Sequence, residues 1–234
     1  MSLEVSIEKK LNSFTLSVEF SLNDGAFAIL GPSGSGKTMT LKCIAGIESP
    51  DRGRIVLDGR TLFDHDGRTD LKPQKRRVGY MFQDYALFPS MTVMGNIMAG
   101  MTGENVRDRA RTIVERFRLT GTESQLPDQL SGGQKQRVAM ARMLAADPEL
   151  ILLDEPFAAL DHDLRKELML ETEEVFRTSG KKAILVTHDR VEAFRLCGSF
   201  AEINEGSLGR VRSSSELRPD IEREMNDIMN CFDL

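Results

Sequence analysis

An apolar run that leads directly into a glycine-rich loop is the feature that most limits how this chain can fold. The run is Phe27-Ala28-Ile29-Leu30, which has the length and composition of a buried strand. The loop that follows is Gly31-Pro32-Ser33-Gly34-Ser35-Gly36-Lys37-Thr38, which matches the pattern of a glycine, four residues and Gly-Lys-Thr. This combination predicts a strand that runs into a phosphate-binding loop and then into a helix.

The residue types of this loop suit the binding of a triphosphate by the backbone. Glycines at 31, 34 and 36 let backbone N–H groups approach an anion, because side chains beyond Cα would block that approach. The helix expected over residues 37–45, which Gly46 would end, points its N-terminal dipole at the same anion. Lys37 then reaches the β- and γ-phosphates, and the Thr38 hydroxyl can ligate Mg²⁺. The alternative is a glycine- and serine-rich turn with no ligand.

Composition limits the class of protein. The chain has 234 residues and a formal net charge of −5, which argues against a dedicated nucleic-acid binder with a basic face. Its three cysteines, Cys43, Cys197 and Cys231, show neither metal-ligand spacing nor a disulfide framework, so a reducing compartment is expected. No signal peptide or membrane-spanning run is recognisable. We therefore expect a cytoplasmic protein without a nucleic-acid partner that, if it serves a membrane, does so peripherally on the inner face.

Hydrophobic periodicity divides the chain into an antiparallel first third, a helical middle and an alternating last part. The alternation of strands and helices after residue 146 indicates a largely parallel α/β core. The segment from about 90 to 146 is predicted to form a helical subdomain. The expected elements are strands over 3–7, 14–22, 27–30, a hairpin over 54–63, a loop over 64–77, a strand over 78–82, a strand over 150–153, and then helix 164–176, strand 183–187 and helix 191–196.

Charged and polar residues follow two of the predicted buried strands. Asp154 and Glu155 come after Ile151-Leu152-Leu153, and His188 comes after the strand that ends at Thr187. The carboxyl end of a parallel strand is where ligands of open α/β sheets bind. Asp154 is suited to hold Mg²⁺ and Glu155 to polarise an attacking water, while His188 could bond a γ-phosphate or that water. The alternative for Asp154 and Glu155 is that they are solvated acids in a turn at the strand end. The alternative for His188 is a purely structural role.

A second possible anion site lies in the helical middle. Ser131 can cap the helix that we expect from Lys135 to Ala146, and Gly132, Gly133 and Gln134 stand between them. The two glycines leave backbone N–H groups open at a helix N-terminus. A helix cap alone explains the serine, but it does not explain the pair of glycines.

Taken together, the motifs resemble those of the nucleotide-binding subunit of ATP-binding-cassette (ABC) transporters over about residues 3–210. The resemblance implies a P-loop NTPase fold with a mostly parallel core sheet, an antiparallel N-terminal β subdomain and a helical signature subdomain. The residues that carry it, in order, are the loop 31–38, Gln83, Leu130 to Gln134, Leu152 to Pro156, Ala159-Leu160-Asp161 and His188.

The resemblance also implies roles and partners. A head-to-tail dimer would hold ATP between the loop of one copy and Ser131 to Gln134 of the other, which explains two anion sites in one chain. Gln83 is then assigned to Mg²⁺ or water and to sensing the membrane partner, Glu155 to general base, His188 to the γ-phosphate and Asp161 to communication across the dimer. Hydrolysis would reopen the dimer and move a permease. An extracytoplasmic substrate-binding protein would deliver the substrate to this permease.

Within the family, the middle of the chain is most similar to the molybdate importer ATPases. The similar segments are 53–60, 75–84 and Leu87-Phe88-Pro89. Comparable segments occur in sulfate, ferric-iron, polyamine and sugar importers, so these substrates stay open. Two other classes also share the motifs: chromosome-structuring ATPase heads, which would need a long coiled-coil insertion that is absent here, and regulatory nucleotide binders without transport.

Three positions depart from the family pattern. The upstream aromatic residue that stacks on adenine is replaced by Lys10-Leu11-Asn12, and only Phe14 is nearby. Met39 stands where a hydroxyl commonly contacts the α-phosphate, which leaves only its backbone N–H. Ala158 and Ala159 stand where the family usually has a serine, so the hydroxyl for one hydrogen bond between subunits is missing.

The remaining expectation concerns the domain organisation. We expect residues 1–234 to form one ATPase domain, with a C-terminal helical extension over about 212–234 and no C-terminal regulatory β-domain. Within this extension, Ile221, Met225, Ile228 and Phe232 form an apolar stripe at helical spacing that is expected to pack on the core.

Overall fold

The computed structural model describes residues 2–158 and 160–223, and its centre is a parallel sheet. Five strands lie in the order β7-β8-β9-β3-β10, and every neighbouring pair among them is parallel. All residues of β3, β8 and β9 are buried, as expected for strands covered on both faces. The strands are β3 (Ala26–Leu30), β7 (Val78–Met81), β8 (Leu150–Asp154), β9 (Lys182–Thr187) and β10 (Ser199–Asn204).

An antiparallel part continues the same sheet beyond β10. The order there is β6-β5-β4-β1-β2, and the short strand β11 joins β2 to β10. In β1 and β2 buried and exposed residues alternate, because one face packs on the core and the other meets solvent. The bounds are β1 (Leu3–Lys10), β2 (Thr15–Leu22), β4 (Arg52–Leu57), β5 (Arg60–Asp64), β6 (Thr69–Asp70), β11 (Ser207–Leu208) and β12 (Arg212–Ser213), which pairs with β10.

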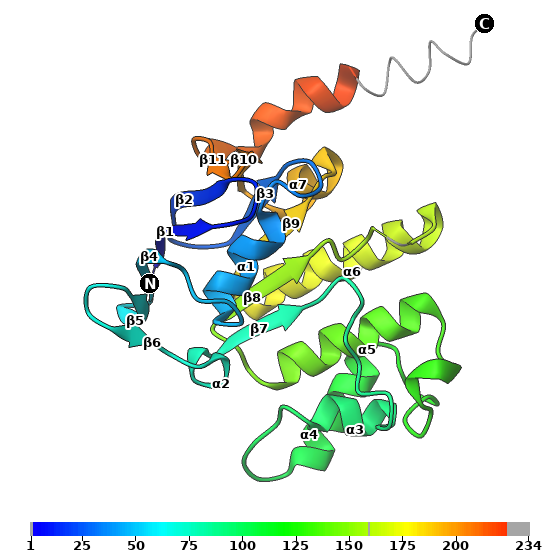
Figure 1. Ribbon diagram of the computed structural model, residues 1–234. Helices are drawn as coiled ribbons and strands as arrows, with labels where there is room; N and C mark the ends of the chain where they lie inside the picture. Colours follow the sequence, from blue (N-terminus) through cyan, green and yellow to red (C-terminus); the bar gives the residue numbers. More distant parts are fainter. Residues whose placement is uncertain (1, 159, 224–234) are drawn as a thin grey trace, which may run out of the picture.

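Two hydrophobic clusters cover the two faces of the parallel sheet. Ala28 and Leu30 of β3 belong to the cluster formed with α3 to α7, whereas Phe27 and Ile29 belong to the cluster formed with α1 and the antiparallel strands. Figure 1 shows α3, α4 and α5 together beside the β7 edge, far from β5 and β6. The helices are α1 (Lys37–Ala45), α2 (Pro73–Arg76), α3 (Val93–Met98), α4 (Val106–Arg116), α5 (Gly132–Ala145), α6 (His162–Ser179) and α7 (Arg190–Leu196), with short 3₁₀ turns at Pro127–Gln129 and Ser214–Leu217.

A fully buried arginine joins α1 to the antiparallel part. The Arg76 guanidinium donates to the carbonyl oxygens of Cys43 and Ile44, at 2.8 and 2.9 Å, which belong to the last turn of α1. It also donates to Leu71 O at 2.7 Å and pairs with Asp70 at 2.8 Å. Arg76 therefore satisfies carbonyl groups that the end of a helix leaves without intrahelical donors.

The mostly parallel core and the antiparallel N-terminal part are confirmed, and some boundaries differ from expectation. The prediction of a loop over 64–77 was wrong, because this segment contains β6 and α2, whose Arg76 contacts could not be read from local periodicity. Helix α5 begins at Gly132 rather than Lys135, since Ser131 caps it. Residues 218–223 are helical and Ile221 packs on the core, but Met225, Ile228 and Phe232 lie outside the described residues.

Candidate functional site

The glycine-rich loop follows the carboxyl end of β3 and leads into α1 (Figure 1). A Cβ atom at Gly31 would lie 2.4 Å from the carbonyl oxygen of Ile203 on β10, so no larger residue fits there. Gly36 has a φ of +108°, which side chains rarely permit, and its Cβ would meet Leu16 at 2.7 Å. The packing of the loop therefore requires glycine at both positions.

Lys37 is the first residue of α1, at the end of this loop, and only 4% of its surface is exposed. Its ammonium group donates to the carbonyl oxygens of Gly31 and Pro32, both at 2.9 Å. It also lies 3.4 Å from a carboxylate oxygen of Glu155. The positive charge is thus held where the loop and the end of β8 meet.

Asp154 and Thr38 form the second half of the site. The Thr38 hydroxyl donates to Asp154 Oδ1 at 2.8 Å, and the Tyr80 hydroxyl of β7 donates to Asp154 Oδ2 at 2.8 Å. Asp154 is 4% exposed, and burial beside this carboxylate raises the pKa of Tyr80. Tyr80 therefore remains a hydrogen-bond donor that fixes the orientation of the carboxylate.

Glu155 and His188 lie next to each other at the ends of neighbouring strands. His188 Nδ1 is 3.4 Å from Glu155 Oε2, and the histidine side chain is 59% exposed. Glu155 has a φ of +45°, in the left-handed region, while its N–H donates to Val186 O at 2.9 Å. Such a strained backbone at a non-glycine residue is common at functional sites. Here the turn brings the carboxylate between Lys37 and His188.

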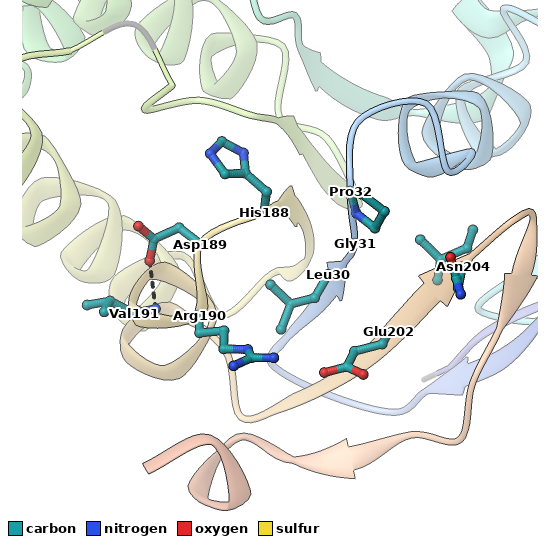
Figure 2. A pocket seen from close by; sticks show the side chains of 10 residues that line it. Leu30, Gly31, Pro32, His188, Asp189, Arg190, Val191, Glu202 and Asn204 are labelled. Atoms are coloured by element: carbon teal, nitrogen blue, oxygen red, sulfur yellow. Dashed lines mark hydrogen bonds between the residues drawn. The ribbon is translucent and has the colours of Figure 1, made fainter. Parts of the chain in front are cut away.

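A cavity of about 660 Å³ adjoins the loop on the side of β10 and α7. Figure 2 shows the turn of His188 and Asp189 on one side and Gly31, Pro32 and Asn204 on the other. His188 and the start of the loop therefore face both this cavity and the cluster of Lys37 and Glu155.

The segment predicted as a signature forms the N-terminus of α5. Ser131 Oγ accepts from Gln134 N at 3.3 Å and Gln134 Oε1 accepts from Ser131 N at 2.9 Å, which is a capping box. A Cβ on Gly133 would lie 2.6 Å from Leu164 of α6, whereas the same position on Gly132 faces open space. Gly133 is thus needed for helix packing, and Gly132 leaves the backbone accessible.

The other predicted residues lie outside this cluster in one copy of the chain. Gln83 is exposed after β7, and Asp161 caps α6 by accepting from Leu164 N at 3.0 Å. Across the described ranges, no hydrogen bond or ion pair joins Gln83, Asp161 or the segment 131–134 to the loop. The single chain therefore brings together Lys37, Thr38, Asp154, Glu155 and His188, with Ser33, Ser35 and Met39 on or next to the loop.

Sequence reasoning missed several residues that shape the site. Tyr80 orients Asp154, Ile203 contacts the loop, and Arg165 of α6 pairs with Asp189 and Glu192 beside His188. Burial raises the pKa of the Glu192 carboxyl, although its hydrogen bond from Thr187 and the charge of Arg165 oppose that effect. No local pattern marks these residues, because each acts on a segment distant in the sequence.

The described residues, 2–158 and 160–223, contain neither a membrane-spanning helix nor a metal-binding cluster of histidine, cysteine and acidic side chains. No helix in these ranges is long and apolar enough to cross a membrane. No group of three or more histidine, cysteine or acidic side chains among them could hold a metal ion.

The fold and the loop define a P-loop nucleotide-binding α/β protein, and comparison with known proteins assigns its family. Residues 16–158 match the family model described as ABC transporter. The chain belongs to the ABC transporter family.

Curated relatives include import ATP-binding proteins with different substrates. The sulfate/thiosulfate import ATP-binding protein CysA of Synechococcus elongatus is 40% identical over 226 residues, which cover 93% of this chain and 64% of that protein. The spermidine/putrescine import ATP-binding protein PotA of Acidothermus cellulolyticus is 43% identical, with 82% and 50% covered. The Fe(3+) ions import ATP-binding protein FbpC of Yersinia pestis is 45% identical, with 81% and 55% covered. The chain thus spans 50 to 64% of the length of these three relatives.

A solved structure shares the fold. The ATP-binding cassette MJ0796, in a dimeric post-hydrolysis state bound to ADP and Pi, superposes with a TM-score of 0.74 at 29% identity, over 92% of this chain and 99% of that one. A second dimeric structure of MJ0796, described as a bacterial ABC transporter cassette, also gives a TM-score of 0.74.

Proposed function

We propose that this chain binds ATP at residues 31–39 and hydrolyses it as the energy-supplying subunit of an ABC importer. The observation that carries the proposal is the meeting of Lys37, Thr38, Asp154, Glu155 and His188 at the carboxyl ends of three neighbouring strands. A nucleoside triphosphate uses each of these groups. Its phosphates suit the ammonium and backbone N–H groups, and its hydrolysis needs a carboxylate beside the attacking water.

Each residue of the loop has a place in this proposal. Ser35 is 5% exposed and its hydroxyl finds no hydrogen-bond partner within the described part of the chain, so a phosphate oxygen would satisfy it. The backbone N–H groups of Gly34 to Met39 lie at the N-terminus of α1, where an anion is favoured. Lys37 would exchange the carbonyls of Gly31 and Pro32 for phosphate oxygens. The half-exposed Phe14 ring lies 3.6 Å from the Cβ position of Gly36, which makes it the candidate for contact with adenine.

The chain's donors fit Mg²⁺. Thr38 and Asp154 offer oxygen atoms 2.8 Å apart, and Gln83 adds an amide oxygen at the end of the strand β7, next to β8. These three residues would hold the ion, which supplies charge neutralisation of the phosphates when bound.

The reaction itself is assigned to Glu155 and His188. The Glu155 carboxylate would accept a proton from the water that attacks the γ-phosphorus, so the bond to the leaving ADP breaks and inorganic phosphate forms. His188, 3.4 Å from Glu155, would donate a hydrogen bond to the γ-phosphate from its exposed ring. Both residues follow strand ends and so share one fixed edge of the sheet.

A second copy of the chain would complete the site. Among the described residues, no hydrogen bond or ion pair joins Ser131 to Gln134 to the loop of their own copy, whereas the open backbone at Gly132 suits an anion carried by a partner. The dimeric state of MJ0796 supports a homodimer. Asp161, at the start of α6, would then face the other copy. Residues 1–234 would act as one ATPase domain with the helical subdomain at about 90–146.

The cargo is proposed to be molybdate or a related oxyanion. The similarity of segments 53–60 and 75–84 to the molybdate importer ATPases supports this assignment. A relative is named for the import of sulfate and thiosulfate, which are also oxyanions. The alternative cargoes are ferric iron and polyamines, for whose import two of the relatives are named, and sugars, which the sequence resemblance also leaves open. The subunit would lie on the inner face of the cell membrane against permease subunits. An extracytoplasmic binding protein would deliver the cargo to these permease subunits.

The assignment of the base is tested with Glu155→Gln. This variant should bind ATP, stabilise the dimer and lose about a hundredfold or more of its turnover, since general bases contribute at least that much. Glu173→Gln on the exposed side of α6 is the matched control and should hydrolyse ATP normally. Undiminished hydrolysis by Glu155→Gln would contradict the assignment.

Binding and transport need separate tests. Lys37→Ala should lose nucleotide affinity, whereas Lys42→Ala in the last turn of the same helix should retain it.

Reconstitution with the permease in liposomes should stimulate ATP hydrolysis. A regulatory nucleotide binder without transport would show no such stimulation, and uptake of molybdate against sulfate, ferric iron or spermidine would identify the cargo.

A further inference from the structure

An arginine outside the nucleotide loop holds the turn that carries His188. The Arg165 Nη2 atom donates to Asp189 Oδ2 and, at 2.6 Å, to Glu192 Oε1. Glu192 is 3% exposed, and its second carboxylate oxygen accepts from the Thr187 hydroxyl. Arg165 is therefore the cation that compensates a buried carboxylate.

The bonds around Arg165 fix both neighbours of His188. The Thr187 hydroxyl accepts from Asp189 N at 3.0 Å, and Asp189 Oδ1 accepts from Val191 N at 2.7 Å and so caps α7. The turn between β9 and α7 consequently has little freedom to rotate. The ring of His188 is left facing Glu155 at 3.4 Å.

The same arginine belongs to the first turn of α6. Its N–H donates to Asp161 O at 2.9 Å, while the Asp161 carboxylate caps the helix through Leu164 N. A displacement of the helix start would carry the guanidinium with it. A continuous set of bonds therefore runs from Asp161 through Arg165 to the turn of His188.

We propose that Arg165 is a positioning residue that couples the start of α6 at Asp161 to the alignment of His188 with Glu155. The inference rests on the proposed function, because Asp161 is expected to face the second copy and His188 the γ-phosphate. Closure of the dimer against Asp161 then sets the histidine in place for hydrolysis. Arginine suits this position because one planar guanidinium can bond two carboxylates at once.

Arg165→Gln is the primary test, measured as steady-state ATP hydrolysis over a range of ATP concentrations. The turnover number should fall by roughly tenfold to a hundredfold, the cost of misplacing a reacting group by about 1 Å, while the KM for ATP stays within a factor of about three. The Hill coefficient for ATP should fall toward one, because this contact links the two sites of the dimer. Lys166→Gln removes the same charge from the next, exposed residue and should match the wild type.

Further variants separate positioning from simple loss of stability. Arg165→Gln removes the guanidinium that pairs with the buried Glu192, so the double variant Arg165→Gln/Glu192→Gln should regain thermal stability but not turnover. Arg165→Lys keeps the charge and should recover part of the turnover. Recovery of full turnover in the double variant would overturn the positioning role, as would normal turnover in Arg165→Gln. Absence of ATP hydrolysis by the wild-type chain would instead refute the proposed function together with this inference.

Discussion

Replacement of Arg76 tests whether the antiparallel part of the protein holds the nucleotide loop through the end of α1. Arg76→Met keeps an apolar stem of similar length but removes every donor of the guanidinium. The side chain has no exposed surface, and burial lowers its pKa despite the nearby charge of Asp70. The variant should therefore fold with an intact core but an unsatisfied helix end.

The magnitude follows from the partners that lose their donor. Cys43 O still accepts a hydrogen bond from Gly46 N at 3.2 Å in the variant. Ile44 O and Leu71 O lose the hydrogen bonds that Arg76 donates to them. Each buried group left unsatisfied costs about 1–3 kcal/mol, and relief of the buried charge offsets part of that sum. The free energy of unfolding is therefore expected to fall by about 2–4 kcal/mol in Arg76→Met. For a domain of this size this decrease corresponds to roughly 4–16 °C in Tm.

Urea unfolding followed by far-ultraviolet circular dichroism measures this loss directly. Arg77→Met is the matched control, because the neighbouring arginine is 58% exposed and forms a surface pair with Glu149 at 2.7 Å. Such a pair contributes about 0–1 kcal/mol. A loss in Arg76→Met no greater than that in Arg77→Met would refute the idea that this buried clamp secures α1.

Three further predictions concern single side chains. Tyr80→Phe removes the second donor to Asp154, and the Mg²⁺ concentration needed for half-maximal hydrolysis should rise about tenfold, as is usual for loss of a group that orients a metal ligand. Phe14→Ala should weaken ATP binding by roughly 1–3 kcal/mol, the usual contribution of base stacking, and leave the binding of inorganic triphosphate unchanged in calorimetry. Burial raises the pKa of the Cys43 thiol to about 12, so iodoacetamide at neutral pH should modify it only after unfolding, as peptide mass spectrometry would show. Because the unfolded thiol, with a pKa near 9.0, loses its proton first, the free energy of unfolding should also fall as the pH rises above about 9.

Local sequence patterns were sufficient for the strand, loop and helix around Gly31 to Thr38. The glycines, the lysine and the buried run of β3 lie within a few residues of one another, so their chemistry and spacing are readable together. The same holds for Asp154 at the end of β8, for Glu155 directly after it and for Ser131 as the cap of α5. Patterns failed over residues 64–77, where the short elements β6 and α2 are held by the contacts of one buried arginine.

The sequence by itself therefore determined the residue types of the site and most of the strands and helices along the chain, because these depend on neighbours along the chain. Only the tertiary structure decided that Thr38 bonds Asp154 across 116 positions, that Tyr80 holds the same carboxylate, and that Arg165 supports the turn of His188. Such contacts depend on which strands become neighbours in the sheet. That order results from burial of both sheet faces by segments far apart in the chain, which no local pattern specifies.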